Sequence, residues 1–237
     1  MLKYLICVNA CILEYFGEKN GFMKYKHIFW DWNGTLLDDA LAACNAVNVM
    51  LDNRKLPRIT FVQYRDYIDV PIVRFYEKVM DMSKESMESL SVEFNSLFRS
   101  FLSESPLSLG AKEVLSAFSS LGIKQYIFSS SENKHIEPFL QKCEIKKYFI
   151  SVIGASDCYV GSKAERTRAF LVQNGIDPNE AVFVGDMVHD CDVASFIGSD
   201  CILVSAGHQS EKALLQTGRE VVSSLPELYN KIINSVG

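Results

Sequence analysis

Residues that could do chemistry stand where predicted strands end. The apolar and aromatic run 27–30 stops abruptly at Asp31, and other apolar runs stop at Ser129, at Asp186 and before the polar loop at 156–157. In parallel α/β sheets, ligands bind beyond the carboxyl ends of the strands. We therefore expect these side chains to converge on one site.

The candidate chemistry is phosphoryl transfer to a carboxylate. An aspartate such as Asp31 is ordinarily ionised at neutral pH and can attack phosphorus, forming an acyl-phosphate that water later opens. Mg²⁺ would relieve the repulsion between the two anions, and it needs few protein carboxylates because it keeps several waters. We expect its ligands to be Asp31, Asp186, Asp190 and the main-chain carbonyl of Asn33, with Lys163 as a nearby fixed positive charge.

Each candidate also has a simpler structural explanation. An aspartate after a strand often only caps a turn, and Ser129 could cap the helix that follows it, with Ser130 as the alternative phosphate contact. Lys163 could be an ordinary lysine near a helix start, although the positive end of the helix dipole disfavours it there. Asp192 competes with Asp190 as an acidic ligand.

Alternating helical and strand patterns follow Pro106. They predict an α/β fold with a doubly wound parallel sheet. The predicted helices are 110–121, 135–142, 163–174 and 193–197, and the predicted strands are 123–128, 149–153, 181–184 and 201–204.

Residues 40–101 show helical periodicity instead, which predicts a small inserted α-helical bundle. We accordingly divide the chain into an α/β core at 23–38 and 106–237 and a helical insert at 39–105. Residues 1–22 form an N-terminal extension of uncertain status: the apolar stretch 4–13 resembles a weak signal peptide but is too short to span a bilayer.

The bulk composition narrows the class of protein. A net charge of -5 without a Lys/Arg run argues against nucleic-acid binding, and no segment argues for a membrane partner. The seven cysteines are odd in number and have no paired CxxC spacing, so we expect reduced thiols and a cytoplasmic protein. The expected partner is a small molecule, and the expected assembly is a monomer or homodimer.

Four separated motifs, taken together, resemble the haloacid dehalogenase superfamily, most closely its phosphoglycolate-phosphatase-like members with a helical cap inserted after the first strand. The motifs are Asp31–Thr35, Ile127–Ser130, Lys163 within 161–163, and Val184–Asp190, and the resemblance covers about residues 24–232. It implies a Rossmann-like core, an Asp31 nucleophile and a small phosphorylated metabolite as substrate. It also implies that Ser129 binds the phosphoryl group.

The expected substrate contacts are Gly34, Thr35, the Ser130 amide and, in the cap, Arg74. Gly34 would let the loop backbone approach the phosphate. Arg74 follows a turn at 69–71 that resembles the specificity loop of the superfamily.

One residue departs from the resemblance. Phosphatases of the superfamily usually carry a second Asp two residues after the nucleophile, as general acid and base, whereas this chain has Asn33. An amide cannot exchange a proton near pH 7, so the hydrolysis rate would be about 10²–10⁴-fold lower if no other group replaced the acid. Three explanations are open: the substrate has a good leaving group, a cap residue supplies the proton, or the enzyme is not a phosphomonoesterase. The alternative functions are a phosphonate hydrolase with an imine-forming cap lysine, Lys55 or Lys78, and a regulatory protein that binds phosphate with reduced turnover.

Overall fold

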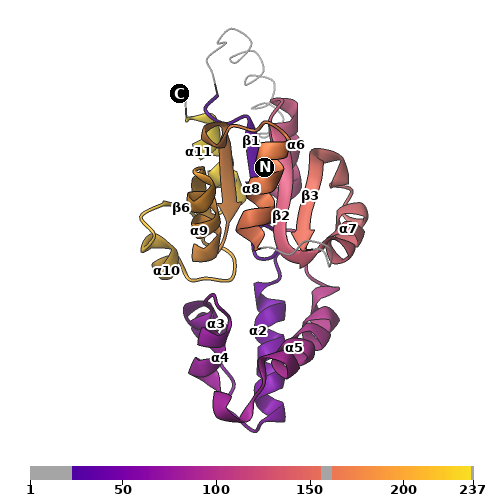
Figure 1. Cartoon of the computed structure of the whole chain (residues 1–237). Coiled ribbons are helices and arrows are strands. Elements are labelled where there is room, and N and C mark those ends of the chain that lie inside the picture. Colours follow the sequence, from indigo (N-terminus) through magenta and orange to yellow (C-terminus); the bar gives the residue numbers. More distant parts are fainter. Residues whose placement is uncertain (1–22, 156–161, 236–237) are drawn as a thin grey trace.

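Six strands form one parallel sheet at the centre of the larger part of the molecule (Figure 1). They are β1 (His27–Trp30), β2 (Lys124–Glu132), β3 (Phe149–Ala155), β4 (Ala181–Gly185), β5 (Asp200–Val204) and β6 (Glu220–Val222). Their order in the sheet is β3-β2-β1-β4-β5-β6, so β1 lies between β2 and β4, and the order reverses there. The computed structural model describes residues 23–155 and 162–235.

Helices cover both faces of this sheet. They are α6 (Ala111–Ser120), α7 (Asn133–Lys142), α8 (Lys163–Gln173), α9 (Val188–Ile197), α10 (Glu211–Leu215) and α11 (Leu225–Ile233). Strand β1 shows how the layers are joined, because successive side chains of a strand point to opposite faces. Ile28 and Trp30 enter the apolar cluster that holds Phe118 of α6, while Phe29 enters the cluster that holds Leu171 of α8. The predicted doubly wound α/β fold is confirmed.

Four helices form the cap, which lies below the sheet in Figure 1. They are α2 (Ala40–Asn53), α3 (Phe61–Tyr67), α4 (Val73–Val79) and α5 (Met87–Leu102). Their apolar side chains build a separate cluster around Met50, Tyr64, Phe75 and Leu90. The division of the chain at residues 39 and 105 stays a prediction.

Two predicted boundaries are wrong in ways that matter for the site. Helix α9 begins at Val188 rather than at residue 193, because the Asp190 side chain accepts the backbone N–H of Met187 and closes the first turn. Strand β2 continues through Ser129 to Glu132, past the predicted end at residue 128. The extension at 1–22 and the loop at 156–157 lie outside the described residues.

The described helices include none with the length and apolar character that a membrane span requires. The described cysteines, Cys44, Cys143, Cys191 and Cys201, are free thiols.

Candidate active site

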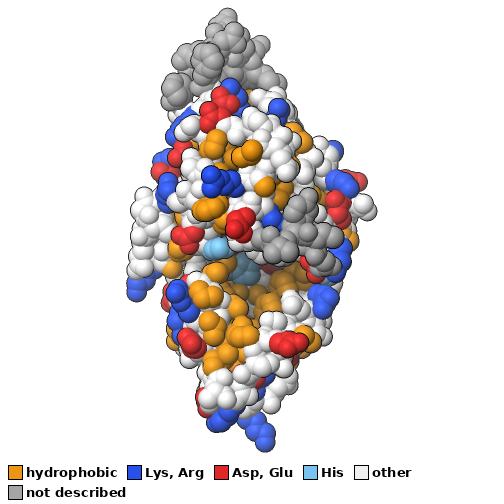
Figure 2. Space-filling model, viewed as in Figure 1, with side chains coloured by type: hydrophobic (Ala, Val, Ile, Leu, Met, Phe, Trp, Pro, Cys, Tyr) orange, Lys and Arg blue, Asp and Glu red, His pale blue; other side chains and the backbone are white. Residues whose placement is uncertain are grey.

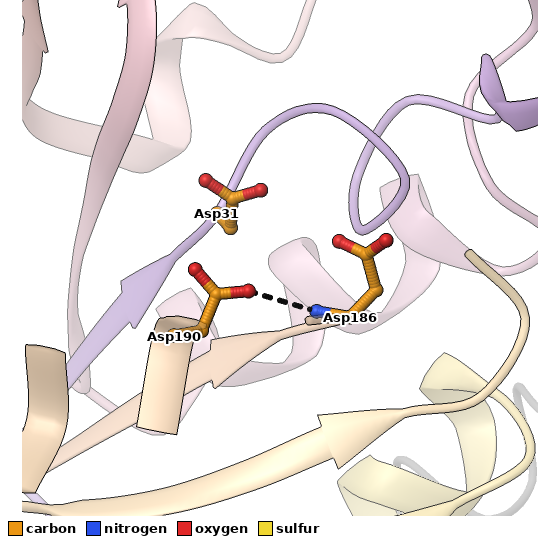
Figure 3. A group of neighbouring side chains, drawn as sticks. All are labelled: Asp31, Asp186 and Asp190. Atoms are coloured by element: carbon orange, nitrogen blue, oxygen red, sulfur yellow. Dashed lines mark hydrogen bonds between the residues drawn. The ribbon is translucent and has the colours of Figure 1, made fainter. Parts of the chain in front are cut away.

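Three buried aspartates meet at the carboxyl edge of the sheet (Figure 3). Asp31 directly follows β1, Asp186 directly follows the neighbouring strand β4, and Asp190 lies in the first turn of α9. One carboxylate oxygen from each lies within 4.8 Å of those of the other two. Asp192, the alternative to Asp190, is exposed. The arrangement is the kind of oxygen-rich group that Mg²⁺ prefers.

Lys163 connects two of these aspartates. Its ammonium donates to Oδ1 of Asp31 at 2.6 Å and to Oδ1 of Asp190 at 2.8 Å, and it lies 4.1 Å from the ring centroid of Phe128. Lys163 is the first residue of α8, where the helix dipole alone would disfavour a cation. The two carboxylates supply the compensating charge.

The site holds more buried carboxylates than positively charged side chains. Burial raises the pKa of Asp31 to about 8, although the Lys163 ammonium acts in the opposite direction. Burial likewise raises the pKa of Asp186 to about 6, against the effect of His208. Asp31 is therefore less readily ionised than its sequence position alone suggests. A divalent cation among these oxygens would restore ionisation, so the donor set fits Mg²⁺.

The Asp190 carboxylate accepts more hydrogen bonds from the protein than the carboxylates of the other two aspartates do. Its Oδ2 accepts from the backbone N–H groups of Asp186 and Met187, both at 3.1 Å, while its Oδ1 accepts from Lys163. These bonds hold the turn between β4 and α9 in place. They also leave Asp190 fewer free lone pairs for direct coordination.

Thr35 and Gly34 support Asp186. The Thr35 hydroxyl donates to Oδ1 of Asp186 at 2.9 Å, so it positions a carboxylate in addition to its predicted role as a substrate contact. Gly34 has φ +74°, and a Cβ there would lie 2.2 Å from Oδ2 of Asp186. A side chain at position 34 would thus collide with the acidic group.

The serines at the end of β2, residues 129–131, point alternately to opposite faces of the sheet. Ser129 is buried and its Oγ accepts from the Ser131 N–H at 3.0 Å, whereas Ser130 is exposed. Ser131 donates through its own hydroxyl to Oδ1 of Asn33 at 2.7 Å. Ser131 was missed in the sequence, because the predicted strand ended at residue 128 whereas β2 continues to Glu132.

Three further residues of the site were also missed. Asp39 accepts from the side-chain N–H of Asn33, and Nε2 of His208 lies 3.2 Å from Oδ1 of Asp39. The hydroxyl of Tyr64, in the cap helix α3, lies 2.8 Å from Nδ1 of His208. Only His208 carried a signal in the sequence, because it follows the predicted strand 201–204 in a polar loop.

The other predicted cap residues lie apart from this group. Arg74 is exposed and its nearest charged partner is Asp69, at 3.7 Å. Lys55 is exposed, and Lys78 is exposed and donates to the backbone carbonyl of Tyr67. In the part of the chain that the structure describes, none of these three is bonded to the aspartate group.

The cap contacts the core through α3 and the loop after β5. Arg65 donates to the carbonyl oxygens of Ser205 and Gln209, and Gln209 donates to the carbonyl of Ile68 at 3.0 Å. Beside this contact, Figure 2 shows a hollow between core and cap with hydrophobic side chains on the cap side.

Comparisons with known proteins agree with this architecture. A family model described as haloacid dehalogenase-like hydrolase matches residues 28–204. A phosphoglycolate phosphatase of Vibrio parahaemolyticus is 26% identical over 223 residues, which cover 87% of this chain and 96% of the relative. A 5'-nucleotidase of Pseudomonas aeruginosa is 22% identical over 198 residues, or 83% of this chain and 90% of the relative.

Solved structures show the same fold at lower identity. A haloacid dehalogenase-like protein of unknown function from Agrobacterium tumefaciens superposes with a TM-score of 0.73 at 21% identity, covering 88% of this chain and 98% of that one. A haloacid dehalogenase-like hydrolase from Streptococcus pneumoniae gives 0.72 at 20% identity, covering 89% and 99%. The family match spans most of the chain, the resemblance predicted from four motifs is confirmed, and this enzyme belongs to the haloacid dehalogenase-like hydrolases.

Proposed function

We propose that the chain is a Mg²⁺-dependent phosphatase of a small phosphorylated metabolite, acting through an aspartyl-phosphate on Asp31. The observation that carries the proposal is that the buried side chains of Asp31, Asp186 and Lys163 come together at the carboxyl edge of the sheet. The phosphoglycolate phosphatases and the 5'-nucleotidase among the relatives act, by their names, on small phosphate esters. They support a small phosphorylated compound as the substrate here.

The residues that would hold Mg²⁺ are Asp31, Asp186, the main-chain carbonyl of Asn33 and Asp190. Because Asp190 already accepts three hydrogen bonds, a contact through water suits it better than direct coordination. When bound, the cation supplies charge neutralisation for the phosphate and for the attacking carboxylate.

The protein groups would then divide the work as follows. Asp31 attacks phosphorus, the bond to the leaving oxygen breaks, and water later opens the acyl-phosphate and restores the carboxylate. Ser129 and the Ser130 amide donate to the phosphoryl oxygens. Lys163 stays between Asp31 and Asp190, so its charge is in place before the phosphate arrives.

Neither alternative gains support from the geometry. An imine-forming lysine needs a pKa lowered by burial or by a neighbouring cation, and both Lys55 and Lys78 are exposed. A measurement of turnover distinguishes a purely regulatory protein from an enzyme. If Asn33→Asp raises turnover strongly, catalysis is impaired or specialised in the wild type; if it lowers turnover, Asn33 is part of the working chemistry.

The decisive experiment is phosphate release from a panel of sugar phosphates, nucleotides, phosphoglycolate and p-nitrophenyl phosphate, with and without MgCl₂. We expect release from at least one compound, its loss with EDTA and its return with added Mg²⁺. Absence of release from the whole panel in the presence of Mg²⁺ would contradict the proposal. Asp186→Asn is the matched variant, and we expect it to need much more Mg²⁺ for the same rate.

The remaining expectations stay predictions. Free thiols at the four described cysteines support a reducing compartment, such as the cytoplasm. The expected assembly, a monomer or homodimer, is measured directly by sedimentation.

A further inference from the structure

The amide of Asn33 is fixed from both ends. Its Oδ1 accepts from the Ser131 hydroxyl at 2.7 Å, and its Nδ2 donates to Oδ2 of Asp39. Turning the amide over would place its oxygen against the Asp39 carboxylate, which can only accept hydrogen bonds when ionised. Asp39 therefore decides which way the Asn33 amide faces.

The Asp39 carboxylate is completely buried and is itself held by several donors. Its Oδ1 accepts from the backbone N–H of Gly34 at 2.7 Å and lies 3.2 Å from Nε2 of His208. His208 is anchored in turn, because its backbone N–H donates to Asp186 at 2.6 Å and its Nδ1 lies 2.8 Å from the Tyr64 hydroxyl. The charge on Asp39 is thus compensated locally, and the orientation of Asn33 is tied to a rigid group.

One N–H of Asn33 goes to Asp39, and the described residues provide no acceptor for the other. A fixed amide N–H can stabilise a developing negative charge on a leaving oxygen, as donors in an oxyanion hole do, but it cannot give up its proton. A carboxylic acid at the same position could transfer its proton to the leaving oxygen, whereas the amide cannot.

We propose that Asp39, supported by His208, is a positioning residue that holds Asn33 as an N–H donor to the leaving oxygen, and that the enzyme therefore prefers phosphates whose leaving group departs as an anion. This inference rests on the proposed function. In the step, the bond from Asp31 to phosphorus forms while the bond to the leaving oxygen breaks. That oxygen keeps the electron pair, and solvent protonates it afterwards. Acyl phosphates, phosphoanhydrides and aryl phosphates meet this requirement, and simple alkyl phosphates do not.

The side chains of residues 33 and 39 can be exchanged with little change of shape. In Asn33→Asp/Asp39→Asn, the Nδ2 of the new amide would face the new carboxylate, and its Oδ1 would still accept from Gly34 and His208. Asn33→Asp alone would instead place a half-buried carboxylate against the buried carboxylate of Asp39, and Asp39→Asn alone would place two amide nitrogens in contact. Both single variants break a hydrogen bond that the double variant restores.

The test measures kcat and KM for substituted phenyl phosphates whose phenols span a wide range of acidity, in saturating Mg²⁺. For the wild type we expect kcat/KM to fall steeply as the phenol becomes less acidic. Asp39→Asn should lower kcat about 10- to 100-fold with KM within about threefold of the wild type. The double variant should recover kcat over Asp39→Asn and show a shallower dependence on the phenol, because a carboxylic acid can protonate the leaving oxygen.

Two results would overturn the inference: Asp39→Asn with wild-type kcat, or a double variant with the same leaving-group dependence as the wild type. Asp66→Asn, which removes an exposed carboxylate from α3, is the control for lost charge. If Asp39→Asn does not fold, Ser131→Ala loosens the same amide from its other end and should lower kcat several-fold. A wild type without Mg²⁺-dependent release from any phosphate would instead contradict the proposed function.

Discussion

The carboxyl edge of the sheet and the cap use charge in opposite ways. At the edge of the sheet, the Lys163 side chain is 6% exposed and bonds to two carboxylates that are also buried. In the cap, Arg58 and Arg74 are 66% and 60% exposed, and each pairs with a single acidic side chain at the surface. Buried, multiply bonded charges are fixed before a ligand arrives, whereas exposed pairs contribute little. This difference supports our proposal that the chemical groups lie in the core and that the cap shapes access to them.

The largest effect should come from Asp31→Asn. The amide keeps the shape of the side chain but cannot attack phosphorus, so we expect kcat to fall by about 10⁴-fold or more. Phosphate release under saturating Mg²⁺ measures it, and thermal unfolding checks that the fold is intact. Turnover within tenfold of the wild type would mean that another group is the nucleophile.

Lys163→Met should have the second largest effect. It removes the buried ammonium from between Asp31 and Asp190, and we expect kcat to fall about 10²- to 10³-fold. Stability should fall as well, by about 3–5 kcal/mol, because two buried carboxylates lose their partner. Urea unfolding measures this change. Lys78→Met, which removes an exposed cap cation, is the matched control and should leave both quantities nearly unchanged.

Arg65→Ala should have a moderate effect, because Arg65 joins the cap to the core. Its guanidinium donates to two backbone carbonyls of the loop after β5, and losing these bonds costs about 1–3 kcal/mol. We expect KM to rise about tenfold with a smaller change in kcat, since the chemical groups lie in the core. A kcat loss as large as that of Lys163→Met would show that the cap contributes to the chemical step.

The smallest effect should come from Arg74→Ala. Arg74 is exposed, and an exposed pair such as that with Asp69 contributes about 0–1 kcal/mol. We expect kcat/KM for each active substrate to change by less than about threefold. A rise of KM by more than tenfold, confined to substrates with a second anionic group, would support the substrate contact that the sequence suggests for Arg74.

The fold and the centre of the site were predictable because both follow from short-range patterns. Strand β1 is a continuous apolar run that ends at Asp31, and β4 likewise ends before Asp186. Parallel strands bring such ends together without further information. The partners of Asn33 could not be found in this way, because Asp39 and Ser131 come from separate segments, and Ser131 lies beyond the predicted end of its strand. His208, which contacts Asp39, comes from a third segment.

The boundaries of secondary structure were less predictable for a related reason. The predicted start of α9 at residue 193 treats the acidic stretch before it as a loop. In the structure Asp190 caps the first turn of that helix and also contacts Lys163. A polar residue with both roles looks the same in the sequence as a loop residue.

The most direct measurement is peptide mapping of the enzyme quenched in acid during turnover of p-nitrophenyl phosphate with Mg²⁺. Our account predicts an acid-stable, base-labile phosphoryl group on the peptide that contains Asp31, absent from Asp31→Asn. Full turnover with no phosphoryl group on that peptide, or with one on a different residue, would contradict it.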